Sequence, residues 1–335
     1  MWSIPTIVRW PFALGFIAAA GAVAWLMSRP DALETTEASP TCASQVARAK
    51  ADAVANPDAA VTELDRLIAL VKSPLPVTDR ERCRSEVSAF SSELARSFHA
   101  RGAKTKRADA LVVAERLYER HVMMFPDATD IVQDRYFHAE VMWSRAETEA
   151  DTAAQAVRWK RAALAFTNVA TATPIDPTLR KESAYAAVLA WKNAINAQPA
   201  APEATDSEAL TPTPLTVDEQ QMLASFDVYF ELADANDDDA VGMRFLKANL
   251  YRRHDQLDVA IPLFRAIIDQ HPEHEVSEYA ANLALDSYNR LGRIDELLAL
   301  TKSLIANKRF LDNKPDLKAL LHQIATSPGA MALHR

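Results

Sequence analysis

Apolar residues recur at steps of three and four positions through most of the chain, which is the spacing of one face of an α-helix. The stretches 64–71 and 294–305 show this pattern clearly. Thr216 and Glu219 have the spacing of a capping box at a helix start. We therefore predict about thirteen helices. They span approximately 45–55, 58–72, 79–101, 106–125, 129–148, 151–172, 177–197, 217–234, 238–254, 257–270, 275–291, 294–307 and 315–325.

One segment interrupts the helical pattern. Residues 198–214 read QPAAPEATDSEALTPTP, and their prolines and small polar residues are typical of a flexible loop. This loop divides the chain into two helical blocks. The predicted organisation is an N-terminal hydrophobic segment at 1–28, a linker at 29–41, a first helical block at 42–197, the Pro-rich loop at 198–216, a second block at 217–325 and a tail at 326–335.

Composition supports an all-α fold. The chain has 335 residues but only six glycines, where average usage would give roughly four times as many. Tight turns and phosphate-binding loops both depend on glycine, whereas alanine, the best helix former, is abundant. The net charge of −8 and the lack of a basic stretch argue against nucleic acid as a partner.

The N-terminal hydrophobic segment predicts export of the body of the protein. Residues 10–27 carry no charge and would form about 27 Å of helix, just enough to cross a hydrocarbon core. Trp10 and Trp25 stand near its ends, where aromatic rings prefer the membrane interface. We expect a single-pass inner-membrane protein whose body lies in the periplasm.

A cleaved signal peptide is the alternative interpretation of the same segment. Ala22-Val23-Ala24 forms an A-x-A cleavage site after a short apolar region. Cleavage near Ala24 would give a soluble periplasmic or secreted protein. The polar residues 29–41 resemble a tether, which argues against a third possibility, a buried N-terminal helix.

Cys42 and Cys83 are the two cysteines of the chain. In an exported protein they are expected to form a disulfide across a loop of about forty residues, a constraint worth roughly 4 kcal/mol. The alternative is a pair of free buried thiols. Two cysteines this far apart lack the close spacing of a metal-binding knuckle.

An internal repeat runs through the chain: a small residue, an aromatic four positions later, and a proline eight positions after that. The small residue would allow two helices to approach, the aromatic would fill the groove between pairs, and the proline would end the helix. The copies are Ala114, Tyr118 and Pro126; Ala162, Phe166 and Pro174; Ala260, Phe264 and Pro272; and a degenerate copy of Ser225, Tyr229 and Asp237.

This pattern resembles the second half of the tetratricopeptide repeat (TPR). The best copy covers about 241–274, where Ala248, Tyr251, Ala260, Phe264 and Pro272 stand at the family's spacings. An export segment followed by divergent repeats resembles envelope-associated TPR proteins of the myxobacterial type. The resemblance implies an α-solenoid of stacked antiparallel helix pairs after one N-terminal hydrophobic helix. The alternative is an irregular helical domain with accidental spacing.

The resemblance also implies a peptide-binding groove lined by the first helix of each pair. The corresponding positions are Phe245, Asn249, Arg252 and Arg253, with Asn282 on the next unit. Asparagine and arginine could hold a peptide backbone and a carboxylate. The alternative is that both arginines are simply solvated or pair with Asp255 and Asp258.

We therefore expect a non-catalytic scaffold or adaptor of the cell envelope that binds other envelope proteins or peptides. No cofactor, metal or catalytic residue is predicted, because the sequence lacks phosphate loops, dinucleotide fingerprints and zinc-protease spacings. His271 and His274 flank an inter-helix turn and are expected to be solvated. A helical enzyme or ligand-binding domain with an unrecognised site is the alternative.

Overall fold

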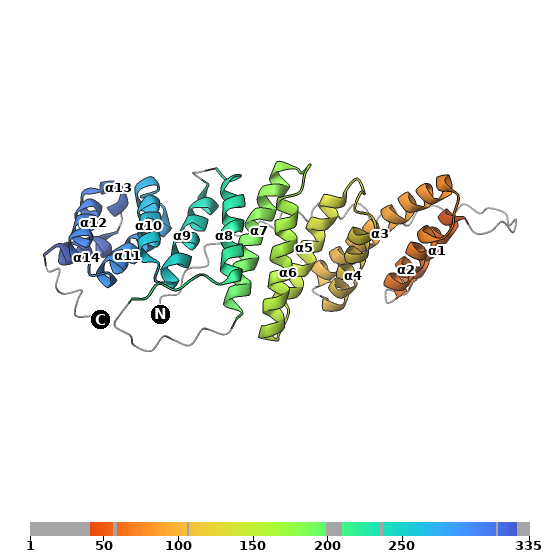
Figure 1. Ribbon diagram of the computed structural model, residues 1–335, viewed down its shortest axis with the longest axis horizontal. Coiled ribbons are helices and arrows are strands. Elements are labelled where there is room, and N and C mark those ends of the chain that lie inside the picture. The colour runs from red at the N-terminus through yellow and green to blue at the C-terminus, as the bar shows by residue number, and fades with distance from the viewer. Residues whose placement is uncertain are drawn as a thin grey trace. The chain divides into compact units, whose positions relative to one another are not determined.

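The computed structural model describes residues 41–55, 59–105, 107–198, 210–234, 237–312 and 314–326. Within these ranges the chain forms fourteen α-helices and no strand. Figure 1 labels these helices. The predicted all-α class is confirmed. The proposed membrane segment at 10–27 lies outside the described residues. Among the described helices, none combines the length and apolar character that crossing a bilayer requires.

The described residues divide into two compact units, one ending at residue 198 and one starting at residue 210. Most of the predicted Pro-rich loop lies outside the described residues, so its boundaries stay a prediction. The helices of the first unit are α1 (Cys42–Ala55), α2 (Ala60–Lys72), α3 (Val77–Thr105), α4 (Ala108–Met124), α5 (Ile131–Glu147), α6 (Thr152–Ala170) and α7 (Pro177–Asn196).

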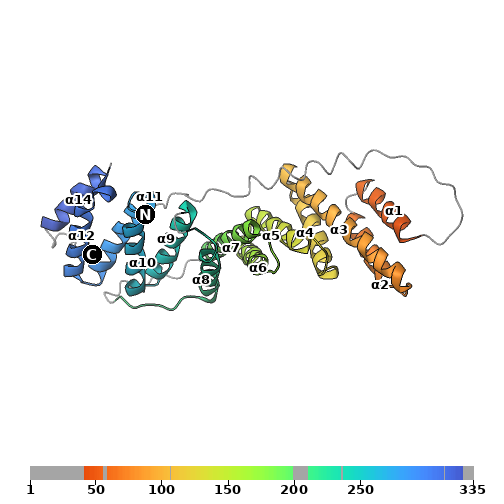
Figure 2. The ribbon, with the colours of Figure 1, turned by 90° about the horizontal axis from the view of Figure 1, so that it is seen from above.

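Successive helices of the first unit pack side by side, and alternate helices also touch. Contacts join each of α1 to α6 to the next helix. Contacts also join α1 to α3, α2 to α4 and α3 to α5. Figure 2 shows this succession from above. The chain therefore builds the unit from consecutive helix pairs, and one core cluster runs from α1 to α5.

The second unit has the same local organisation. Contacts join α8 to α9, α9 to α10, α10 to α11 and α11 to α12, and α9 also touches α11. Its helices are α8 (Val217–Phe230), α9 (Asp238–Arg253), α10 (Leu257–Gln270), α11 (Glu275–Arg290), α12 (Ile294–Ala306), α13 (Lys308–Leu311) and α14 (Pro315–Thr326).

The small and aromatic residues of the repeat pattern are buried. The three full copies lie on the second helices of the pairs α3/α4, α5/α6 and α9/α10, and the degenerate copy lies on α8, the first helix of the second unit. The four small residues are at most 3% exposed, and the four aromatic rings are completely buried. Each helix of the three full copies ends before the pattern's proline, and in the degenerate copy Asp237 caps the next helix. The pattern therefore marks the positions at which these helices contact their neighbours. The four helices are α4, α6, α8 and α10.

The predicted disulfide between Cys42 and Cys83 is confirmed. The bond joins the first residue of α1 to α3, and the two Cα atoms lie 5.5 Å apart. Cys83 is completely buried in the core of the first unit, with Val87 and Phe90 on the same helix. The bridge therefore fixes the start of α1 to the core of the first unit.

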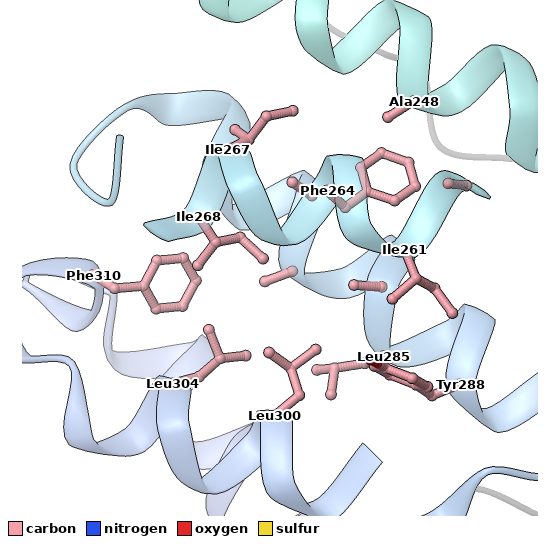
Figure 3. Close-up of a cluster of buried hydrophobic side chains, with 14 of the residues drawn as sticks. Ala248, Ile261, Phe264, Ile267, Ile268, Leu285, Tyr288, Leu300, Leu304 and Phe310 are labelled. Carbon is pink, nitrogen blue, oxygen red and sulfur yellow. The ribbon is translucent and has the colours of Figure 1, made fainter. Parts of the chain in front are cut away.

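The core of the second unit is continuous from α9 to α14. Figure 3 shows Ile268, Leu304 and Phe310 converging from three different helices. Phe310 belongs to α13, which the sequence did not predict. The side chain of Asn307 caps this short helix by accepting a hydrogen bond from the Phe310 amide. One buried aromatic ring and one side-chain cap therefore stabilise α13.

Helix α3 is longer than predicted at both ends and continues through Gly102. A Cβ atom at Gly102 would lie 2.6 Å from Cδ2 of Leu111 at the start of α4, closer than real contacts allow. Glycine is therefore required here for the close approach of α3 and α4. Helix α8, by contrast, ends at Phe230, four residues before the predicted end.

Side-chain caps define several helix starts. At the start of α8, the Thr216 hydroxyl accepts from the Glu219 amide, and the Glu219 carboxylate accepts from the Thr216 amide. The predicted capping box is therefore confirmed. Asp176 caps α7 by accepting from two amides and is followed by a proline at the first helical position.

Candidate functional site

Helices α9 and α11 run side by side with a constant offset in sequence. The ring centroids of Phe245 and Tyr279 are 6.5 Å apart, and Nη2 of Arg252 lies 2.7 Å from a carboxylate oxygen of Asp286. Both contacts join residues that are 34 positions apart. Equivalent turns of two successive pairs therefore face each other.

The turns that follow these helices keep nearly the same offset. Asp255 pairs with Arg290 at 2.6 Å, and Asp258 pairs with Arg293 at 2.6 Å, each pair 35 positions apart. These partly exposed pairs contribute little stability individually. Asp255 and Asp258 therefore pair with arginines of the following helix pair, and no ion pair joins either of them to Arg252 or Arg253 among the described residues.

The five predicted groove residues differ in how accessible they are. Asn249 and Asn282 are half-buried, and neither side-chain amide has a hydrogen-bond partner among the described residues. Arg253 is exposed and makes no ion pair within the described part of the chain. Arg252 is half-buried and held by Asp286. These four side chains remain near the surface of α9 and α11.

Phe245 has a different role from the one that the sequence predicted. It is only 5% exposed and packs against Phe264 and Tyr279 in the core of the second unit. Its ring therefore joins three helices and does not present a surface to a bound peptide. The polar residues form the accessible part of this face, which we call the α9/α11 face: Asn249, Arg252, Arg253, Asn282 and Asp286.

The segment before α8 is fastened to the turn that ends α9. The Thr213 amide donates to the His254 carbonyl at 2.9 Å, and the Gln256 side chain donates to the Thr213 carbonyl at 2.7 Å. Nε2 of His254 lies 2.8 Å from the buried Glu219 carboxylate. Burial alone would raise the pKa of Glu219, but the hydrogen bonds from His254 and Thr216 hold it below its ordinary value.

His274 acts as a helix cap. Its Nδ1 accepts a hydrogen bond from the Val276 amide at 3.1 Å, at the start of α11, while its Nε2 lies 3.0 Å from Asp238. Within the part of the chain that the structure describes, no group of three or more His, Cys, Asp and Glu residues is placed to hold a metal ion.

A serine, a histidine and an aspartate meet inside the first unit. Oγ of Ser91 on α3 lies 2.7 Å from Nδ1 of His121 on α4, and Nε2 of His121 lies 3.1 Å from Asp134 on α5. Arg96 also donates to Asp134, at 2.9 Å. Burial would raise the pKa of Asp134, but its contacts with His121 and Arg96, and with Ser92, keep it below the ordinary value.

This network is inaccessible to a substrate. Ser91 is completely buried, and His121 and Asp134 are each 1% exposed. A nucleophile must reach its substrate, and this hydroxyl lies between three packed helices. The arrangement therefore satisfies buried polar groups where α3, α4 and α5 meet. No local sequence motif predicts this network, because its members lie on three separate helices.

Two carboxyl groups, Glu140 on α5 and Glu182 on α7, influence the buried Tyr136. Burial raises the pKa of Tyr136 well above its ordinary value, and the charges of both glutamates contribute. Burial raises the pKa of Glu140 to about 8, and the charge of Glu182 contributes to the increase. Glu140 is thus largely protonated at neutral pH, which lessens the repulsion between the two carboxyl groups.

A cleft of about 620 Å³ opens between α4, α5 and α6. It is distinct from the buried network. Its polar lining includes Arg135, His138 and Arg161, and its apolar lining includes Val122, Met142 and Leu164. The sequence analysis did not predict this site, because no motif connects residues on three helices.

Comparison of the sequence with protein-family models gives no match, and comparison with curated proteins gives none either.

Proposed function

We propose that this protein is a non-catalytic scaffold of the tetratricopeptide repeat type, which binds partner polypeptides on the α9/α11 face. The observation that carries the proposal is the offset of 34 residues between Phe245 and Tyr279 and between Arg252 and Asp286. A period of 34 residues is that of the TPR. Burial of the small and aromatic pattern positions supports the same assignment.

Stacked pairs of this kind form a solenoid whose first helices line one continuous face. On the α9/α11 face, the amides of Asn249 and Asn282 each offer a donor and an acceptor to an extended peptide backbone. The unpaired guanidinium of Arg253 offers a fork of donors to a carboxylate. The face therefore suits an extended segment that carries an acidic group.

The place of action that we propose is the cell envelope. The Cys42–Cys83 disulfide supports a body outside the cytoplasm, because such bonds persist in oxidising compartments. The uncharged run at 10–27 would either anchor the protein in the inner membrane or direct its export before cleavage. In both cases the partners are envelope proteins or peptides.

Charge reversal on the α9/α11 face tests the proposal. The R252E/R253E variant is expected to lose at least about tenfold of its capture of envelope partners relative to wild type, since charge-assisted hydrogen bonds are lost. The matched control is R265E, because Arg265 is exposed on α10 and makes no ion pair among the described residues.

A second variant separates recognition from stability. R252E places a new carboxylate next to that of Asp286. The double variant R252E/D286R restores an ion pair between the two positions, with the charges exchanged. We expect R252E/D286R to fold like wild type and still to capture less partner, because the charges presented to the partner have changed places. Unchanged capture by R252E/R253E would contradict the proposal.

A further inference from the structure

The cleft between α4, α5 and α6 combines an unpaired positive charge with an apolar lining. Arg135 on α5 is half-buried and makes no ion pair with any residue that the structure describes. Burying part of a charge without a partner is unfavourable, so such a group is most stable when an anion approaches it. The chain as a whole carries a net charge of −8, which makes a local positive site unusual.

A second guanidinium reinforces this charge. Arg161 on α6 lines the cleft, and its Nη2 lies 3.2 Å from the buried Glu115 carboxylate. The same carboxylate also accepts from Arg145. Arg135, Arg145 and Arg161 therefore carry three positive charges against the single negative charge of Glu115. The net charge of these four residues is +2, which favours an anion in the cleft.

His138 supplies an additional polar atom. Its ring stacks on Tyr118, with centroids 5.9 Å apart, and its buried Nε2 has no hydrogen-bond partner among the described residues. Burial lowers the pKa of His138 to about 4, and the charge of Arg161 contributes, so the ring is neutral at physiological pH. A neutral imidazole can donate one hydrogen bond from Nε2 without adding charge.

The apolar part of the lining suits a hydrocarbon group, and Asn168 is a further polar residue of the lining. Val122, Met142 and Leu164 come from α4, α5 and α6 respectively, and Leu164 is 48% exposed. An exposed leucine beside a concave apolar surface gains stability when a ligand covers it. A cleft of about 620 Å³ is within the range of small-molecule sites.

We propose that this cleft binds a small organic carboxylate with an apolar body. The carboxylate would accept hydrogen bonds from Arg135, whose planar fork matches two oxygens, and from Nε2 of His138. The apolar body would lie on Val122, Met142 and Leu164. A monoanion suits the site better than a phosphate, because Glu115 already partly neutralises Arg161. The site is separate from the α9/α11 face and does not depend on partner binding there.

Ligand-observed NMR with the full chain tests the site, with phenylacetate as the probe. Phenylacetamide has nearly the same shape without the charge, and inorganic phosphate has charge without an apolar body. We expect phenylacetate to bind wild type at millimolar concentration or below, and phenylacetamide and phosphate to bind at least about tenfold more weakly. R135Q is expected to weaken phenylacetate binding by about tenfold or more.

Two further variants make the outcome unambiguous. R253Q removes an exposed, unpaired arginine from the second unit and is expected to bind phenylacetate like wild type. L164S removes apolar contact without changing charge, and is expected to weaken phenylacetate binding severalfold. Because Leu164 is partly exposed, this variant should fold normally. Circular dichroism of each variant verifies the fold.

The proposal is overturned by any of three results. The first is that wild type does not bind phenylacetate at 10 mM, which corresponds to a binding free energy of about 2.7 kcal/mol. The second is that folded R135Q binds phenylacetate as tightly as wild type does. The third is that phosphate binds as tightly as phenylacetate. The last result would assign the cleft to simple anions.

Discussion

Removing the disulfide should release α1 from the rest of the first unit. The bond spans 41 positions, and the loop-entropy relation assigns about 4 kcal/mol to a closure of this length. Among the described helices, α1 makes substantial contact only with α2 and α3, so it can open without unfolding the rest of the unit. The C42A/C83A variant is therefore expected to lose stability locally, at α1.

The described apolar contacts of α1 are small beside the bridge. Ala49 and Ala53 are the buried residues among its described side chains, and Val46 packs partly buried against the same core. The two buried methyl groups contribute about 1.5–2 kcal/mol. Lys50 pairs with Glu93 at 3.1 Å, but both side chains are more than a third exposed, so this pair adds less than about 1 kcal/mol.

Hydrogen exchange measured by mass spectrometry gives the local opening free energy directly. The protection factors of the α1 amides are expected to fall by between tenfold and about a thousandfold in C42A/C83A. The upper limit follows from about 4 kcal/mol for the disulfide, because about 1.4 kcal/mol corresponds to a factor of ten. Amides of α7, at the other end of the unit, serve as the internal reference and should not change. Wild type treated with reductant should reproduce the variant. Protection of α1 within threefold of wild type would refute the reasoning.

Three substitutions, each followed by urea unfolding, test the packing and electrostatics. G242A should raise the free energy of unfolding by about 1 kcal/mol, since nothing lies within 4 Å of the added methyl group. G102A should change the free energy of unfolding by about 1–3 kcal/mol less favourably than G242A does, because its methyl group would overlap Leu111. Equal effects of the two substitutions on the free energy of unfolding would contradict the close approach of α3 and α4. D134A should lose about 1–3 kcal/mol, because it leaves the buried His121 and the partly exposed Arg96 without their carboxylate. A loss below about 1 kcal/mol would contradict the network. Finally, Glu140 should stay protonated in the folded protein between pH 4.5 and about 8, whereas it loses this proton in the unfolded chain. The free energy of unfolding of wild type should therefore fall relative to that of E140Q as the pH rises through this window. A constant difference between pH 5 and pH 8 would contradict the raised pKa.

The helices were largely predictable because burial imposes a periodic pattern on their residues. The exceptions have local causes. Helix α13 has four residues and buries Phe310 as its core residue, so it is too short to show a period. The predicted helix 79–101 ends just before Gly102, whereas in the structure Gly102 lies inside α3 and allows the close approach of α4. A single sequence does not distinguish a glycine that is required for helix packing from a glycine that ends a helix.

The candidate sites were less predictable than the helices. The family resemblance placed Phe245 on an accessible face, but here its ring fills the space between α9, α10 and α11. Ser91, His121 and Asp134 come together only because α3, α4 and α5 pack. Arg135 and the rest of the cleft depend on the same packing. Helical periodicity reports which face is buried, but it does not report which neighbour covers that face.

Site-specific photo-crosslinking in cells tests most directly whether the α9/α11 face binds partner polypeptides. A photoreactive amino acid would replace Asn249 or Asn282 on this face, or Val259, which is 44% exposed on α10, as the control. We predict crosslinks to the same partner polypeptide from 249 and 282, none from 259, and loss of both crosslinks in the R252E/R253E background. Crosslinks from 259 that equal those from 249 and 282, or crosslinks that persist after the charge reversal, would contradict the account.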